Sequence, residues 1–193
     1  MIGTTYHEDK EALESVRGKI NLAWGSKVSE DFCRKAVAIS KRLSWQPSQA
    51  SDLMSCIAFE SGETFSPSVK NMAGSGATGL IQIMPNTAHG LGTTVEDLKL
   101  LTAESQLDYV EMYFLPYAKR IKTLSDMYMA ILMPKFIGAS DLARLFTNGT
   151  AYRQNSGLDA NNDGTVTKRE ATAKVAAELA KGLRPGYYRQ VDF

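Results

Sequence analysis

The sequence has no excess of charge of either sign and no long apolar run. Its 22 Lys and Arg residues oppose 21 Asp and Glu residues, which leaves a formal net charge of +1 over 193 residues. Because the two signs nearly cancel, the chain has no electrostatic reason to bind nucleic acid or an anionic membrane surface. No stretch of about 18 uncharged apolar residues occurs. The N-terminus also lacks a basic stretch followed by an apolar run. We therefore expect no nucleic-acid partner, no stable membrane insertion and no signal peptide.

Cysteine and histidine are scarce, which limits disulfide and metal chemistry. Cys33 and Cys56 could pair, but both fall inside amphipathic patterns, so we expect buried reduced thiols. His7 and His89 are isolated histidines, and we interpret them as ordinary polar positions and not as metal ligands.

The apolar residues recur mainly at helical spacing, which predicts a mainly α fold with a small β element. Ser29, Thr102 and Ser125 are plausible helix caps, and Gly62 is a plausible helix end. The predicted helices cover 7–23, 29–44, 47–62, a short segment from Pro85, several segments within 94–146, and 168–182. Residues 80–84 are predicted to form a short strand.

One carboxylate continues the apolar stripe of the third predicted helix. Leu53, Cys56, Ile57 and Glu60 stand at i, i+3, i+4 and i+7, with Glu60 at the C-terminal end. The helix dipole and apolar burial both disfavour the ionised form of an acid at this place. A protonated acid near neutral pH can serve as a general acid. Helix position alone, however, favours a solvated glutamate at a fraying helix end.

Two motifs, one that begins at this acid and one that follows it, favour a catalytic role for Glu60 over a solvated glutamate. E-S-G at 60–62, followed by GATGLIQIMP at 76–85, resembles the two leading motifs of the soluble lytic transglycosylase family, a branch of the lysozyme superfamily related to goose-type lysozymes. The resemblance covers about residues 53–132. It implies a lysozyme-like transglycosylase fold, with N-terminal helices in 1–46 packed on a catalytic domain of 47–193, as one compact domain. It also implies cleavage of the β-1,4 bond between MurNAc and GlcNAc in peptidoglycan.

The resemblance implies site residues at matching positions. Glu60 matches the single catalytic acid/base. Arg153 departs from the third family motif, A-Y-N-x-G, whose start fits Ala151 and Tyr152, and Asn155 follows two residues later. Small residues in 74–79 would let sugar rings approach the backbone. Tyr113 is a possible sugar platform, and core packing is the alternative for both tyrosines. The substrate-binding candidates are Ser61, Ser75, Thr78, Gln82, Met84, Tyr113 and Tyr152.

The chemistry depends on whether a second carboxylate is available, because most glycosidases use two. The nearest is Glu63, but Gly62 intervenes, and Glu96 and Asp97 suit the first turn of a helix. A one-acid mechanism therefore fits best. If the attacker is the sugar's own 6-hydroxyl, the product is 1,6-anhydro-MurNAc; if it is water, the enzyme is a hydrolytic lysozyme like the goose type. The sequence leaves this choice open.

A second motif, DANNDGTVTKRE at 159–170, fits the full EF-hand calcium loop. Gly164 permits the sharp turn, and Thr167 stands where a water often mediates. The segment before the loop is a poor entering helix, so a lone loop points to one structural Ca²⁺ site and not to a sensor. The alternative is a polar turn without metal. The expected metal ligands are Asp159, Asn161, Asp163, Thr165 and Glu170.

Together the two motifs favour a phage endolysin or a virion-associated lysin that acts on peptidoglycan glycan strands as a monomer. Without a signal peptide, such a protein would be made in the host cytoplasm and would reach the cell wall in the periplasm. The alternative of another class is a non-catalytic calcium-binding module that binds the wall.

Overall fold

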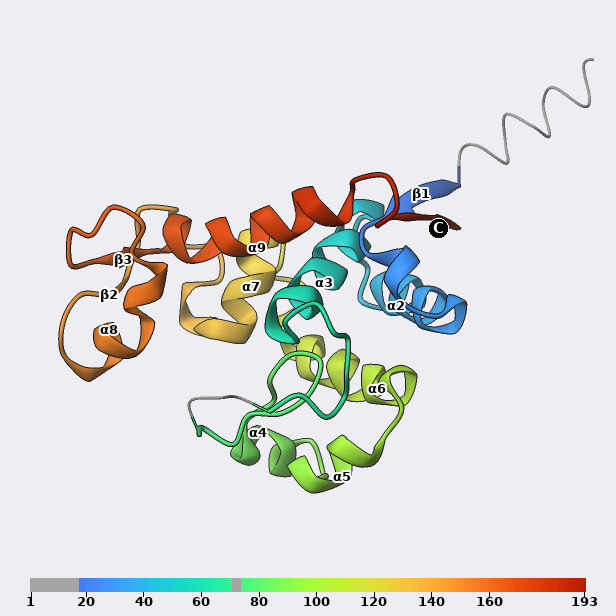
Figure 1. Cartoon of the computed structure of the whole chain (residues 1–193), viewed down its shortest axis with the longest axis horizontal. Coiled ribbons are helices and arrows are strands. Elements are labelled where there is room, and N and C mark those ends of the chain that lie inside the picture. Colours follow the sequence, from blue (N-terminus) through green and yellow to red (C-terminus); the bar gives the residue numbers. More distant parts are fainter. Residues whose placement is uncertain (1–17, 71–73) are drawn as a thin grey trace, which may run out of the picture.

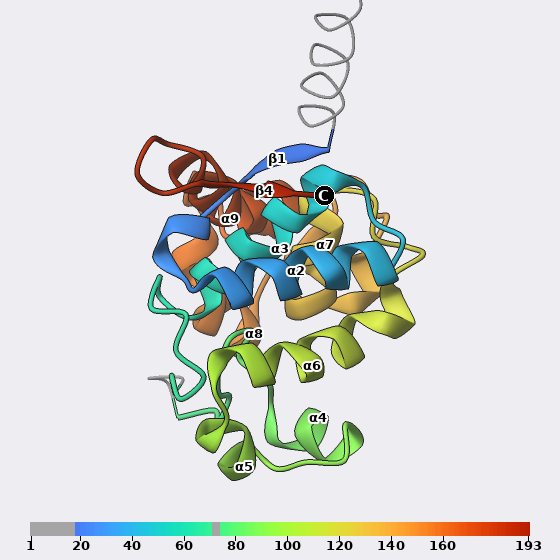
Figure 2. The ribbon, with the colours of Figure 1, turned by 90° about the vertical axis from the view of Figure 1, so that its right-hand side faces the viewer.

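The computed structural model describes residues 18–70 and 74–193 and is mainly helical (Figures 1 and 2). The described residues also form two small two-stranded sheets, so the predicted class, mainly α with a small β element, is confirmed. Within the same residues, no helix combines the length and the apolar character needed to cross a membrane. The helices are α2 (Glu30–Arg42), α3 (Pro47–Glu60), α4 (Pro85–Gly90), α5 (Val95–Leu100), α6 (Ala103–Phe114), α7 (Leu124–Leu132), α8 (Gly149–Asn155) and α9 (Lys168–Gly182). The strands are β1 (Lys19–Leu22), β2 (Arg144–Phe146), β3 (Val166–Thr167) and β4 (Arg189–Asp192).

Helix α3 forms the centre of the core, and α2, α7 and α9 pack against it. It begins at Pro47 behind a capping box formed by Gln46 and Gln49. All its residues from 49 to 58 are buried, polar ones included, so its buried surface is wider than the single apolar stripe that the spacing predicts. One buried hydroxyl on this helix is satisfied within the helix, because Ser55 donates to the carbonyl oxygen of Ser51 at 2.7 Å.

Helix α9 lies along one side of the molecule, with the β2–β3 sheet at one end and the β1–β4 sheet at the other (Figure 1). Helices α4 and α5 lie on the opposite side of the molecule from α9 in both views (Figures 1 and 2). The segment between α3 and α4 joins these two sides, and it contains the E-S-G and GATGLIQIMP motifs.

The helix predicted over 7–23 is wrong where the structure describes it, and 7–17, with His7, lie outside the described residues. Residues 19–22 form strand β1, which pairs antiparallel with β4 so that Lys19 lies opposite Asp192. Ile20 and Leu22 are the more buried residues of the strand and Lys19 and Asn21 the exposed ones. This alternation with period two is typical of a strand. Its four residues are too short a stretch to outweigh a helical pattern.

Three further local predictions are wrong. Thr123, and not Ser125, caps α7, because the Thr123 hydroxyl accepts a hydrogen bond from the backbone N–H of Asp126. Residues 80–84 form a turn instead of a strand, closed by a single bridge between Thr78 and Ile83. Strand β2 also stands in a stretch that the spacing assigned to helices.

Other local predictions are confirmed. Ser29 and Thr102 cap α2 and α6, and α9 covers 168–182 as expected. Both cysteines are free and buried.

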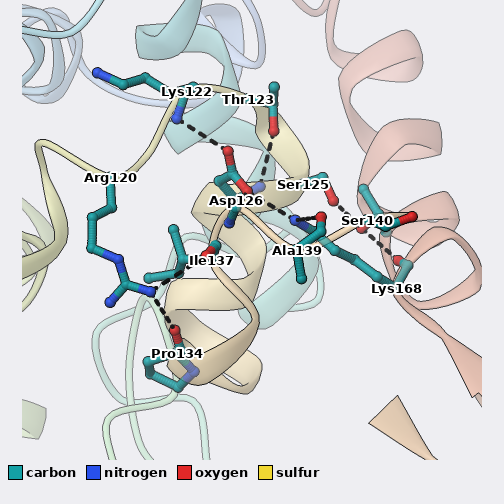
Figure 3. A network of polar contacts seen from close by, with 12 residues as sticks. Arg120, Lys122, Thr123, Ser125, Asp126, Pro134, Ile137, Ala139, Ser140 and Lys168 are labelled. Carbon is teal, nitrogen blue, oxygen red and sulfur yellow. Dashed lines mark hydrogen bonds and ion pairs between the residues drawn. The ribbon is translucent and has the colours of Figure 1, made fainter. Parts of the chain in front are cut away.

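A buried ion pair joins α7 to the first turn of α9 (Figure 3). The Lys168 ammonium donates to a carboxylate oxygen of Asp126 at 2.8 Å and to the carbonyl oxygen of Ala139 at 3.0 Å. Asp126 also accepts from the backbone N–H of Gly138 at 2.8 Å. Side chains of Lys168 and Asp126 are only 2% and 7% exposed, so solvent screens this pair little. The pair fixes the start of α9, and with it the EF-hand-like loop, against the helical core.

Candidate active site and metal loop

Glu60 is the last residue of α3 and stands where the helix reaches the surface. Ser61 follows as the C-cap, and Gly62 turns the chain with a positive φ of 60°, which glycine adopts without strain. The Glu60 side chain is partly exposed. Burial of its carboxyl nevertheless raises its pKa from 4.5 to about 7, and no ion pair or hydrogen bond among the described residues offsets that effect. Near neutral pH the carboxyl therefore exists in both protonation states.

Two phenol groups lie close to Glu60, one on α6 and one on α7. Burial raises the pKa of Tyr113, and the negative charges of Tyr117 and Glu60 raise it further. Burial also raises the pKa of Tyr128, and the negative charge of Glu60 is the second cause. The Tyr128 ring packs edge-on against the Phe59 ring, with 5.5 Å between the ring centroids. Both phenols thus stay protonated and can act as donors. The Tyr113 hydroxyl, however, donates to the carbonyl oxygen of Ala130 at 2.7 Å, which orients its ring.

Tyr128 was missed by the sequence reasoning. It comes near Glu60 only because α7 packs on α3, and nothing in the local pattern around 128 distinguishes it from a core aromatic. It is 2% exposed, so its ring is part of the core.

The carboxylate of Glu63 is held by a partner on α9. Both of its oxygens accept from the Lys181 ammonium at 2.6 Å, and that ammonium also lies over the Trp24 ring at 5.3 Å from its centroid. Glu63 has a positive φ of 65°, and its backbone N–H donates to the carbonyl oxygen of Ala58 at 2.7 Å. The second carboxylate near Glu60 is therefore engaged as an anchor for the turn that follows α3.

Three of the predicted substrate-binding residues make hydrogen bonds within the loop itself. Ser61 is 1% exposed, and its hydroxyl accepts from the backbone N–H of Phe65 at 3.0 Å. Thr78 is also 1% exposed. Gln82 donates through its side-chain amide to the carbonyl oxygens of Val69 and Gly79, at 3.2 and 3.0 Å. These contacts give Ser61 and Gln82 a clear role in shaping the backbone beside Glu60.

The other predicted candidates differ in their surroundings. Ser75 is exposed and Met84 is 46% exposed, so both can contact a ligand. Tyr152 donates its hydroxyl to a carboxylate oxygen of Asp159 at 2.7 Å, which ties it to the EF-hand-like loop. Asn155 donates its side-chain amide to the carbonyl oxygen of Ala151, one turn earlier.

A fully buried glutamine organises the GATGLIQIMP loop, and the sequence reasoning missed it. The Gln106 side chain on α6 accepts from the backbone N–H of Leu80 at 2.7 Å. It donates to the carbonyl oxygens of Pro67 and Leu98 at 3.0 and 2.8 Å. Gly79 makes room for it, because a Cβ there would lie 2.2 Å from the Gln106 oxygen. A lone polar residue inside an apolar helical pattern is the signal that could have identified Gln106.

The EF-hand-like loop is shaped by its own carboxylates. Asp159 accepts from the backbone N–H groups of Asp163 and Gly164 at 3.3 and 3.0 Å. The hydrogen bond from Tyr152, followed by those from the backbone, lowers the pKa of Asp159. Asn162 and Gly164 adopt positive φ angles of 58° and 82°. Strand β3 of this loop pairs with β2, so that Val166 lies opposite Phe146. In a pair of EF-hands, a second calcium loop would take the place of β2.

The closing residue of the loop leaves one oxygen without a partner. Glu170 accepts through Oε2 from the backbone N–H and the hydroxyl of Thr167, at 2.9 and 2.7 Å. Its Oε1 is buried and has no hydrogen-bond donor among the described residues. A buried carboxylate oxygen of this kind is stabilised by a hydrogen-bond donor, an ordered water or a cation. Within the described residues no three His, Cys, Asp or Glu side chains converge on one point. Two of the five expected ligands are an amide and a backbone carbonyl, and the three carboxylates, those of Asp159, Asp163 and Glu170, do not converge on one point in this structure.

Comparison of the chain with known proteins found no matching family model, no matching curated protein and no matching solved structure.

Proposed function

We propose that this protein cleaves the β-1,4 bond between MurNAc and GlcNAc in peptidoglycan, with Glu60 as its single acid/base and with a lysozyme-like transglycosylase fold. The observation that supports this most is the Glu60 carboxyl, which burial brings to a pKa of about 7 while solvent still reaches the side chain. An acid tuned to neutral pH can both donate and accept a proton. The engagement of Glu63 by Lys181 also supports a mechanism with one carboxylate.

The reaction then proceeds in two proton transfers. Protonated Glu60 donates to the glycosidic oxygen as the bond breaks, and the substrate's acetamido group and nearby dipoles stabilise the positive sugar. Ionised Glu60 then accepts a proton from the attacking hydroxyl, which restores its starting state. Attack by the 6-hydroxyl gives a 1,6-anhydro sugar, the outcome that we favour, and attack by water gives a reducing end.

Substrate recognition falls to the segment between α3 and α4. Ser75 and Met84 offer exposed side chains, and the ring of Tyr113 offers a partly exposed surface near Glu60. Ser61, Thr78 and Gln82 act indirectly in this proposal, since they hold the backbone whose N–H and C=O groups meet the sugar. Tyr152 contributes through the metal loop.

We also propose that the loop 159–170 holds one structural Ca²⁺ through the oxygens of Asp159, Asn161, Asp163, Thr165 and Glu170. The unpartnered Oε1 of Glu170 supports this, because a cation would satisfy it. The ion would supply positive charge that ties the start of the loop to the first turn of α9. The ordered carboxylates of Asp159 and Glu170 are the groups that would bind it most strongly.

The proposed biological setting is that of a phage endolysin or virion-associated lysin, made in the host cytoplasm and acting as a monomer on the wall in the periplasm. Nothing in the balanced charge conflicts with an uncharged glycan as the partner.

The test compares wild-type protein with Glu60→Gln on purified peptidoglycan, with Glu63→Gln as the matched control. We expect Glu60→Gln to remain folded and to release no muropeptides, while Glu63→Gln keeps most of the activity. Mass spectrometry of the released products distinguishes anhydro from hydrated ends by the mass of one water. Retention of activity by folded Glu60→Gln, or a wild type that binds the wall without cleaving it, would overturn the proposal.

A further inference from the structure

A second buried acid on α3 stands apart from Glu60 and has no assigned role. Asp52 is 8% exposed, and burial raises the pKa of its carboxyl from 3.8 to about 6. No ion pair or hydrogen bond among the described residues offsets this burial. Eight residues separate Asp52 from Glu60, which is about 12 Å along a helix. Asp52 therefore lies outside the candidate site around Glu60.

Asp52 lines a cavity of about 350 Å³ between three segments that are far apart in the sequence. These segments are β1, the first turns of α3 and the end of α9, which lie together in both views (Figures 1 and 2). The volume falls within the range of about 300–1,000 Å³ typical of small-molecule sites. Most of the exposed lining is apolar, contributed by Ile20, Pro47, Leu179 and Leu183.

Among the residues that line this cavity, Asp52 is the one that carries a charge. The neighbouring Ser51 hydroxyl is already engaged, because it donates to the carbonyl oxygen of Asn21 at 3.2 Å and accepts from the backbone N–H of Ala23 at 3.1 Å. The Asp52 carboxylate therefore has the spare capacity to accept hydrogen bonds from a ligand. Beside apolar walls, such an acid favours a cation.

We propose that this cavity binds a small alkylammonium group, with the ammonium against the Asp52 carboxylate and the alkyl chain against Ile20, Leu179 and Leu183. An anion would be repelled, and a neutral alkyl ligand would leave the carboxylate without a partner. Ca²⁺ is a poorer fit, because it takes six to eight oxygen ligands and the cavity offers a single carboxylate. This inference does not depend on the proposed glycosidase activity.

The test uses the full chain with n-hexylammonium as the probe and n-hexanol as its neutral counterpart. At about pH 7.5 both the amine and Asp52 carry their charges. Backbone amide NMR shifts should saturate with n-hexylammonium and cluster at residues 20–21, 47–52 and 179–183. Because a hydrogen bond to a charged group is strong when shielded from water, n-hexanol should bind at least about tenfold more weakly.

Two variants make the test specific. Asp52→Asn keeps the shape of the side chain and should abolish the preference for the amine. Asp108→Asn is the matched control, since it removes one negative charge at an exposed position on α6 and should leave binding unchanged. Leu183→Trp should block the cavity while Asp52 stays intact, which keeps the test decisive if Asp52→Asn does not fold.

The proposal is overturned if n-hexylammonium shows no saturation at millimolar concentrations. Equal affinity for n-hexanol, or unchanged amine binding by folded Asp52→Asn or by Leu183→Trp, would overturn it as well.

Discussion

Replacing Glu60 by Gln should make the protein more stable at alkaline pH. Folding raises the pKa of Glu60 from 4.5 to about 7. Below pH 4.5 the carboxyl is protonated in both the folded and the unfolded state, so it costs nothing. As the pH rises from 4.5 to about 7, the unfolded state ionises while the folded state still holds its proton, so stability is lost progressively and the full cost is present above about pH 7.

The size of this effect follows from the shift. Each tenfold change in proton affinity is worth about 1.4 kcal/mol, so a rise from 4.5 to about 7 corresponds to about 3 kcal/mol once Glu60 is fully ionised. Solvent reaches the side chain, and we therefore expect about 2–3 kcal/mol. For a chain of this size, that corresponds to a rise in melting temperature of about 4–12 °C.

The assay is urea unfolding followed by circular dichroism, at about pH 5 and about pH 8 and at fixed calcium. Glu60→Gln should exceed wild type clearly at the higher pH and much less at the lower one. Glu63→Gln is the control, because it breaks a solvent-exposed ion pair and should lower stability by at most about 1 kcal/mol. An equal gain at both pH values, or none at the higher pH, would refute the reasoning.

The same buried contacts predict other outcomes. Lys168→Met leaves the Asp126 carboxylate without its buried counter-charge, so the free energy of unfolding should fall by about 3–5 kcal/mol in urea titrations; a change below about 1 kcal/mol would contradict this. Gly79→Ala should lower the free energy of unfolding by about 1–3 kcal/mol, because φ is 84° and the new Cβ would meet Gln106; a wild-type melting temperature in thermal unfolding would argue against that packing. Calcium at a hundredfold excess over its dissociation constant should stabilise the protein by about 2.7 kcal/mol, and Glu170→Gln should weaken this response; a melting temperature indifferent to a chelator would exclude the ion.

Local signals in the sequence predicted the elements that local contacts form. Ser29 accepts from a backbone N–H three residues later, as predicted. Thr167 and Glu170, which we assigned to the calcium loop, also form a reciprocal capping box at the start of α9. Both patterns are complete within four residues, so they can be recognised from the sequence alone. The placement of Glu60 at the end of a buried helix followed in the same way from spacing and from Gly62.

Contacts between distant segments could not be predicted. Strand β1 forms because a strand near residue 190 pairs with it, and its own four residues give no comparable signal. The approach of Tyr128 to Glu60 depends on how α7 packs against α3. The cap of α7 was misassigned because Thr123 and Ser125 both fit the pattern, and only the observed start of the helix distinguishes them.

The position of Gln106 sets an order in which the candidate site can be assembled. Its partners Leu80 and Pro67 precede it by 26 and 39 residues. A chain leaving the ribosome therefore exposes Glu60 and the whole GATGLIQIMP segment before the side chain that holds that segment exists. A nascent chain that stops short of α6 carries every residue of both motifs, yet the backbone N–H of Leu80 lacks its acceptor. The segment can therefore take up its observed conformation only after α6, which lies near the middle of the chain, has been made and has docked.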